Sequence, residues 1–68
     1  MENEIVMKFE GLSQGRAGKK ILRKIEVMPG VEYAGVDEDA GIVTVIGGDI
    51  DRLSLEDEIE AMGYPLVR

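Results

Sequence analysis

The chain has 68 residues and a formal net charge of −6, and it contains no cysteine, histidine or tryptophan. This length predicts one domain, residues 1–68, with a core only just large enough to hold a fold. The missing residue types exclude disulfides, thiolate nucleophiles, zinc-finger sites and histidine general bases. No apolar run approaches the roughly 18 residues of a membrane span, and the acidic beginning at residues 1–4 is unlike a signal peptide. We therefore expect a cytoplasmic protein with no membrane partner, and the negative charge argues against nucleic acid.

Residues 4–10 alternate between apolar and polar side chains, which predicts a half-buried strand. A glycine-bounded loop at 11–15 follows. The apolar residues from Ala17 to Met28 then recur at the spacing of one helix face, so we expect a helix over 16–28. Pro29-Gly30 should end it, because proline cannot continue a helix and glycine opens a turn.

The second half of the chain repeats this arrangement. Residues 31–37 and the β-branched run 42–46 predict two strands joined by a turn at 38–41. We expect its acidic stretch, Asp37-Glu38-Asp39, to be solvated rather than a calcium or magnesium site. Ser54, with Asp57 three residues on, predicts a helix start with a capping box. Leu55, Ile59 and Met62 continue that helix, and Gly63 should end it. A short last strand is expected over 64–67, where Pro65 confines it to a sheet edge.

The predicted order is βαββαβ, which favours an α+β ferredoxin-like sandwich, a four-stranded antiparallel sheet with two helices on one face. The side chains expected to face the helices are Ile5, Met7, Phe9, Ala34, Val36, Val43 and Val45. The side chains expected on the opposite face are Val6, Tyr33, Ile42, Thr44 and Ile46. The methionines at 7, 28 and 62 are expected to fill gaps in the core.

Several segments together resemble the heavy-metal-associated domain, the fold of copper chaperones and of modules in metal-pumping ATPases. The segments that carry the resemblance are Phe9-Glu10-Gly11-Leu12, Met28-Pro29-Gly30-Val31, Val36-Asp37, Val43-Thr44-Val45 and Gly63-Tyr64. They occur in the family's order and cover nearly the whole chain. The resemblance implies the same ferredoxin-like fold, a non-enzymatic protein, and a role in metal transport or partner binding.

The family's metal loop reads G-M-T-C-x-x-C, and the matching stretch here begins at Gly11. Its degenerate positions are Leu12, Ser13, Gln14 and Ala17, with Gln14 and Ala17 where the two cysteines would stand. Soft Cu(I) selects thiolate and thioether ligands, so the resemblance implies no metal site and no cofactor here. Arg16 adds a positive charge inside the loop, which would repel a cation.

The charges are unevenly distributed. Five of the eight cations lie within nine residues: Arg16, Lys19, Lys20, Arg23 and Lys24. Such runs are usually solvated helix faces. In the resembling family, however, the loop, the following helix start and the G-Y tip form the docking surface for partner domains. The matching positions here are Arg16, Lys19, Lys20 and Tyr64, to which we assign docking of a partner or an anion.

We therefore predict a protein-interaction module within a metal-handling system, which binds a protein partner with an acidic surface or associates with itself. Two alternatives remain open. The first is a genuine heavy-metal chaperone with an atypical site. The second is a regulatory domain that binds an anion or small molecule, because the N–H groups and dipole at a helix start attract negative charge. No motif places an acid–base pair, so an enzyme is the least favoured class.

Overall fold

The computed structural model describes residues 3–13 and 17–67, which form three strands and two helices. Their bounds in chain order are β1 (Asn3–Lys8), α1 (Ala17–Glu26), β2 (Val31–Asp37), β3 (Ile42–Gly47) and α2 (Arg52–Ala61). The strand predicted over 31–37 is confirmed with the same bounds. The predicted strands at 4–10 and 42–46 and both predicted helices are confirmed with ends shifted by up to three residues, as expected where caps and turns decide the boundary.

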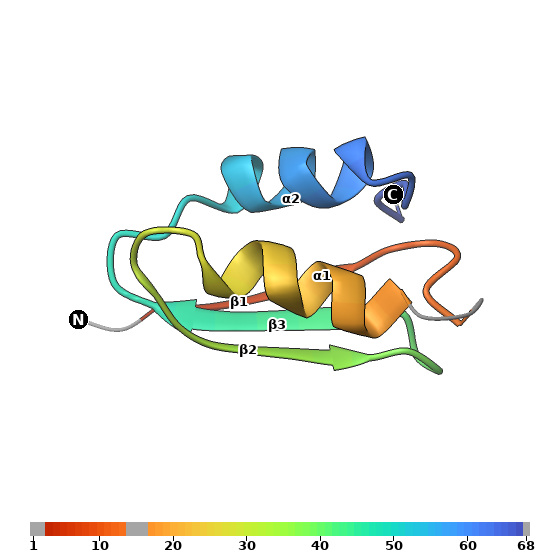
Figure 1. The fold of residues 1–68 in the computed structure, drawn as a ribbon, viewed down its shortest axis with the longest axis horizontal. Helices are drawn as coiled ribbons and strands as arrows, with labels where there is room; N and C mark the ends of the chain where they lie inside the picture. Colours follow the sequence, from red (N-terminus) through yellow and green to blue (C-terminus); the bar gives the residue numbers. More distant parts are fainter. Residues whose placement is uncertain (1–2, 14–16, 68) are drawn as a thin grey trace.

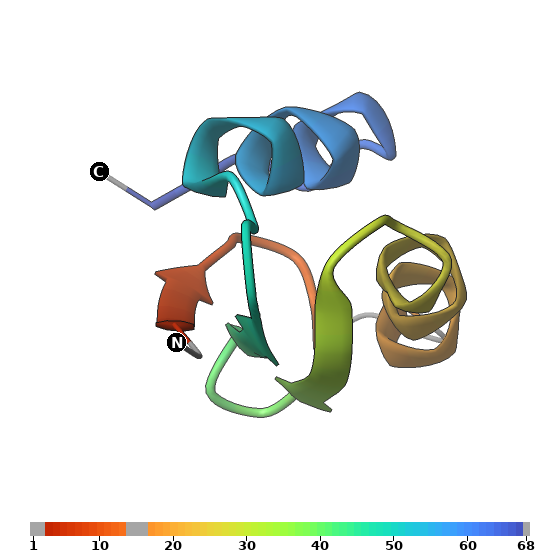
Figure 2. The same cartoon turned by 90° about the vertical axis from the view of Figure 1, so that its left-hand side faces the viewer.

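The three strands form one antiparallel sheet in the order β1-β3-β2. Both helices lie on the same side of it (Figure 1). Seen from the end of the molecule, α1 lies beside β2 and α2 lies above β1 and β3 (Figure 2). The sheet therefore has one face covered by helices and one face open.

The predicted fourth strand is wrong in its extent within the described part of the chain. Only one bridge pair forms, between Phe9 and Leu66, flanked by hydrogen bonds from Glu10 N–H to the Pro65 carbonyl and from Val67 N–H to the Lys8 carbonyl, both 2.8 Å. Pro65 has no N–H to donate. The Leu66 N–H lies on the side of the segment away from β1 and donates to the Glu60 carboxylate at 3.2 Å. Among the described residues the segment therefore lies against the end of β1 as a single bridge.

The core lies between the sheet and the helices, where the alternation of β1 and β3 places every second side chain. Its buried residues are Met7, Phe9, Leu12, Ala17, Ile21, Ile25, Val43, Val45, Leu55 and Ile59. Ile5, Ala34 and Val36 pack against its margin and are only partly buried. Met7 confirms the expected core role of methionine, and Met28 and Met62 pack against the same cluster.

The start of α2 corrects the predicted cap. Asp51, not Ser54, is the N-cap: its carboxylate accepts the Leu53 N–H at 3.2 Å and the Ser54 hydroxyl at 2.9 Å. Asp51 has the extended backbone that this position requires. Ser54 therefore lies inside the helix. The predicted end is confirmed, because Gly63 has a φ of +103° just after the C-cap Met62.

One charged residue of α2 ties this helix to the sheet. Arg52 donates from Nε to the Glu56 carboxylate and from Nη2 to the Val6 carbonyl, each at 3.1 Å. The second bond uses a carbonyl on the outer edge of β1. Each helix is ten residues long, and none among the described residues is long and apolar enough to cross a membrane.

Candidate functional site

The loop that follows β1 contributes both to the core and to the surface. Leu12 is 1% exposed and belongs to the hydrophobic core, as does Ala17, the first residue of α1. Ser13 between them is exposed. Gln14 and Arg16, which the sequence analysis also assigned to this site, lie outside the described residues. The Leu12 and Ala17 positions are therefore occupied by packed apolar side chains.

The start of α1 is bonded to a carboxylate from a distant part of the chain. Glu38, in the turn between β2 and β3, accepts the Gly18 N–H at 2.9 Å through Oε2. Gly18 leaves room for this carboxylate, because a Cβ at that position would lie 3.0 Å from Glu38 Cδ and Oε2. A negative charge at this end of a helix is favourable, since the helix dipole and free N–H groups point toward it.

The contact between Glu38 and Gly18 changes the prediction that the acidic turn is solvated. Asp37 and Asp39 are exposed, and the Asp37 carboxylate accepts the Ala40 N–H at 3.1 Å, as a turn residue commonly does. Glu38 is only half-exposed and its carboxylate is bonded to α1. The solvated turn is confirmed for its two aspartates but not for the glutamate between them.

Lys19 and Lys20 are exposed in the first turn of α1, which contains no acidic residue. Neither forms an ion pair with any residue that the structure describes. Further along the helix, Lys24 pairs with Glu58 of α2 at 3.5 Å. The beginning of α1 therefore presents two exposed lysines without an ion pair among the described residues, whereas its end is tied to α2.

Tyr64 lies beside the loop that follows β1. Its ring atom Cδ1 is 3.7 Å from the position that a Cβ on Gly11 would take. The ring is half-buried and packs against the hydrophobic core. The segment after α2 and the loop after β1 therefore meet at one end of the molecule, near the bridge between Phe9 and Leu66.

The donor set at this end does not fit a soft metal ion. The chain has no cysteine and no histidine, and the two thiolates of the family loop have Gln14 and Ala17 in their places. Within residues 3–13 and 17–67, no group of three or more acidic side chains is arranged to hold a metal ion. Cu(I) prefers thiolate and thioether sulfur, so no step of metal transfer can be derived through this loop.

Sequence reasoning located the loop, the lysines and Tyr64 but missed Glu38. No local pattern identifies it, because its partner Gly18 is twenty residues away. The available signal was indirect. Gly18 stands in the first turn of a predicted helix, where glycine is unfavourable unless something approaches closely.

No protein-family model matches the chain, and comparison with curated protein sequences finds no match. Solved structures do match. The CopZ metallochaperone superposes with a TM-score of 0.88 at 27% identity, over 96% of this chain and 100% of that one. The CsoZ metallochaperone gives 0.90 at 25% identity over 100% of both chains. The water-soluble region of the P-type ATPase CopA from Bacillus subtilis gives 0.86 at 28% identity, over 98% of this chain and 46% of that one.

These matches establish structural similarity to the metallochaperones of heavy-metal-associated type, and with it the ferredoxin-like fold of that group. The matched structures cover 96–100% of this chain. The chain has this fold without any cysteine. Fold does not by itself carry function, and the site must be argued from its own residues.

Proposed function

We propose that this chain is a non-enzymatic protein-interaction module that works within a metal-handling system and binds a partner with an acidic surface. The docking surface consists of Arg16, Lys19, Lys20 and Tyr64. The observation that carries the proposal is the pair of exposed lysines, Lys19 and Lys20, for which the described residues offer no carboxylate partner. Their charge is thus available to a carboxylate from outside.

The position of these lysines is unfavourable for the isolated helix. Cations at a helix start oppose the dipole by a few tenths of a kcal/mol each. Glu38 offsets part of this effect through its bond to Gly18. A partner carboxylate would offset the remainder, and this would favour the complex over the free chain.

The two alternatives receive less support. A metal carrier needs ligands, and the chain offers neither thiolate nor imidazole. An anion-binding domain would use the N–H groups at the start of α1, and one of these, that of Gly18, already donates to Glu38. Docking of a protein requires neither a metal ligand nor that N–H group.

The test is an NMR titration with a glutamate-rich decapeptide as the probe. We expect the largest amide shifts at the start of α1, with binding that weakens as salt is raised, because exposed charges are screened. Replacing both lysines, Lys19→Glu with Lys20→Glu, should raise the dissociation constant about tenfold.

The matched control is Arg23→Glu with Lys24→Glu, which changes the net charge equally but one turn further along the same helix. We expect a smaller loss from this control. Equal losses from the two variants would mean that only net charge matters and would contradict the proposed surface. A one-to-one Cu(I) complex that survives competition by a chelator would favour the metal-carrier alternative instead.

A further inference from the structure

The uncovered face of the sheet carries a regular array of side chains. The register pairs Glu4 with Ile46, Val6 with Thr44, and Lys8 with Ile42 across β1 and β3. It pairs Tyr33, Gly35 and Asp37 of β2 with the same three β3 residues. We call these nine positions the open face: Glu4, Val6, Lys8, Tyr33, Gly35, Asp37, Ile42, Thr44 and Ile46.

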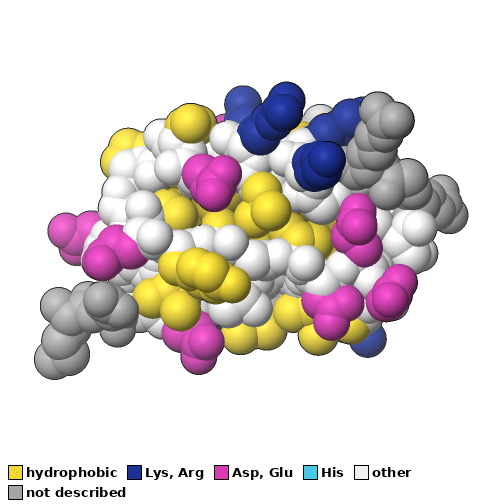
Figure 3. Space-filling model, turned by 60° about the horizontal axis from the view of Figure 1, so that its bottom comes forward, with side chains coloured by type: hydrophobic (Ala, Val, Ile, Leu, Met, Phe, Trp, Pro, Cys, Tyr) yellow, Lys and Arg dark blue, Asp and Glu magenta, His cyan; other side chains and the backbone are white. Residues whose placement is uncertain are grey.

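The open face is apolar along much of its central strand, β3, which carries Ile42 and Ile46 on either side of Thr44. Val6 is 49% exposed and Tyr33 is 57% exposed, whereas Ile42 and Ile46 of β3 are half-buried between them. The space-filling view of this side shows hydrophobic side chains along its centre and acidic ones around it (Figure 3). An apolar centre with a polar rim is the pattern of an interaction surface.

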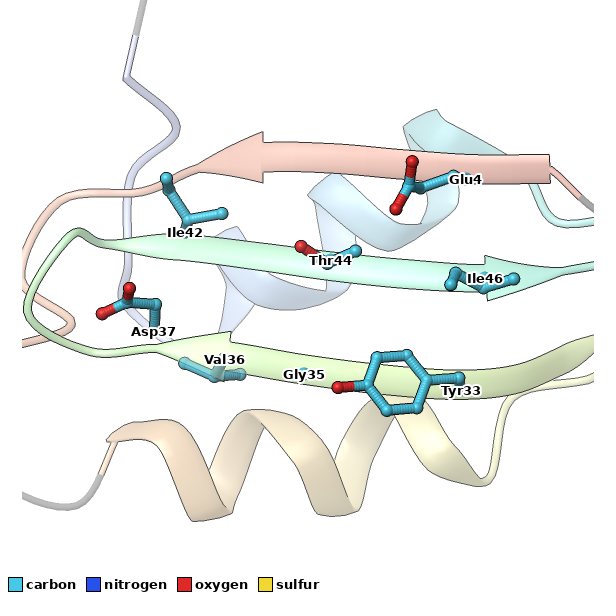
Figure 4. A pocket seen from close by; sticks show the side chains of 8 residues that line it. All are labelled: Glu4, Tyr33, Gly35, Val36, Asp37, Ile42, Thr44 and Ile46. Carbon is cyan, nitrogen blue, oxygen red and sulfur yellow. The ribbon is translucent and has the colours of Figure 1, made fainter.

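A shallow hollow lies over β2 and β3. Its lining comes from Ile42, Thr44 and Ile46 of β3, from Glu4 of β1, and from β2 between Tyr33 and Asp37 (Figure 4). The ring of Tyr33 extends along β2 over Gly35, with its hydroxyl 2.8 Å from the position of a Cβ on that glycine. Covering a sheet glycine with an aromatic ring stabilises the strand.

The charged residues lie at the corners of this array. Two copies of the array can be placed face to face so that their charges match. On β1, Glu4 and Lys8 lie on either side of Val6. On β2, Tyr33 and Asp37 lie on either side of Gly35. A two-fold axis perpendicular to the strands, through the row of Val6 and Thr44, exchanges the two ends of each strand. Each charge then faces an opposite charge or a hydroxyl.

We propose that the open face binds a second copy of this chain face to face about that axis. Glu4 of each copy faces Lys8 of the other, and Tyr33 faces Asp37. Ile42 faces Ile46, Thr44 faces Thr44 at the centre, and Val6 faces Val6 along the β1 edge. Two sheets packed in this way lie about 10 Å apart with their strands nearly aligned, a gap that a glutamate and a lysine at the rim can bridge.

The charges available for this pairing are not used elsewhere in the described chain. Glu4, Lys8 and Asp37 form no ion pair there, and the only side-chain bond of Asp37 uses Oδ1, to Ala40. Each interface of this kind is isologous, because the same patch is used twice. Charge complementarity therefore selects a second copy as the occupant.

The expected dimer is weak. Nine positions, each covering about 30 Å² from the strand spacing and the two-residue repeat, give a projected patch of about 300 Å². Stable complexes bury about 800 Å² of accessible surface on each partner. We expect a dissociation constant of about 0.1–1 mM. The dimer therefore forms at high local concentration, not in dilute solution.

Sedimentation equilibrium on the full chain, from about 10 µM to about 2 mM, measures this association. We expect the average mass to rise from that of one chain toward that of two as concentration increases. The amide shifts that follow concentration should belong to β1, β2 and β3 on the open face. A mass that stays at one chain throughout, or shifts confined to the helices, would overturn the proposal.

Two sets of variants define the geometry. Val6→Glu places two carboxylates together at the β1 edge of the interface, and Lys8→Glu places a carboxylate against Glu4 of the other copy. Each should raise the dissociation constant at least tenfold. The double change Glu4→Lys with Lys8→Glu restores opposite charges across the proposed axis and should return the constant to within about threefold of the original.

The control for Val6→Glu is Val27→Glu. Val27 is 80% exposed, and it follows α1 on the other side of the sheet, so association should be unchanged. Circular dichroism checks that each variant is folded. If the double variant has a dissociation constant as high as that of Lys8→Glu alone, the proposed axis is wrong. A two-fold axis along the strands would instead bring residue 8 against Asp37, so exchanging Glu4 and Lys8 would not restore opposite charges there. Equal weakening by Val27→Glu contradicts the open face itself.

Discussion

The two helices have the same length and cover the same face of the sheet, but they begin in different ways. α2 is capped by Asp51, the residue immediately before it, whose carboxylate bonds to Leu53 and Ser54. α1 receives the carboxylate of Glu38, from a turn twenty residues away in the sequence. The free N–H groups at a helix start favour a nearby carboxylate. That carboxylate can come from the preceding residue, as in α2, or from a distant segment that only the fold brings close, as in α1.

The helices also differ in charge. α1 carries a run of lysines and arginine, whereas α2 carries four acidic residues. One pair, Lys24 with Glu58, joins them at 3.5 Å with both side chains about half exposed. Such a pair contributes at most about 1 kcal/mol. The helices are therefore held in place chiefly by their buried apolar stripes and not by their opposite charges.

The largest expected effect tests whether the helices are equivalent in the core. Ile25 of α1 and Ile59 of α2 are both fully buried. We expect Ile25→Ala and Ile59→Ala each to lower the free energy of unfolding by about 2–5 kcal/mol, from lost burial and the remaining cavity. Urea denaturation measures this, with the exposed Val27→Ala as control. A cost below 1 kcal/mol for one helix only would show that this helix is not part of the cooperative core.

A smaller effect is expected at the start of α2. Asp51→Ala removes the acceptor for the Leu53 N–H and the Ser54 hydroxyl, and should destabilise the fold by about 1 kcal/mol. Ser54→Ala removes only a side-chain bond inside the helix, so its cost should be a few tenths of a kcal/mol. Urea midpoints compare the two. A larger loss of stability from Ser54→Ala than from Asp51→Ala would mean that Ser54 is the N-cap.

The smallest effect is expected at the start of α1. Glu38→Gln keeps an oxygen that can accept the Gly18 N–H but removes the negative charge near the helix dipole. We expect a loss of about 0.5 kcal/mol that shrinks as salt is raised. Asp39→Gln is the matched control, because Asp39 is an exposed neighbour in the same turn. Equal costs from the two variants would mean that the contact with α1 contributes nothing.

Much of the fold could be predicted because its signals are local. The alternation in β1 and the β-branched run of β3 place their side chains on two faces by geometry alone, and the helical stripe of Leu55 and Ile59 does the same. The fourth strand was overestimated, because Pro65 has no N–H to donate to β1 and a single bridge, Phe9 with Leu66, forms among the described residues.

Some features of the candidate site also follow from the sequence alone, and others depend on the fold. The sequence by itself determined that no thiolate or imidazole is present, that Lys19 and Lys20 begin a helix, and that the loop departs from the metal-binding pattern. These are statements about composition and near neighbours, which the chain carries wherever it folds. Only the tertiary structure decided that Glu38 meets Gly18, that Leu12 is core, and that the corners of the open face match their own two-fold image. Each of these contacts joins residues that are far apart in sequence. They form only once the strand register and the packing of the helices are in place.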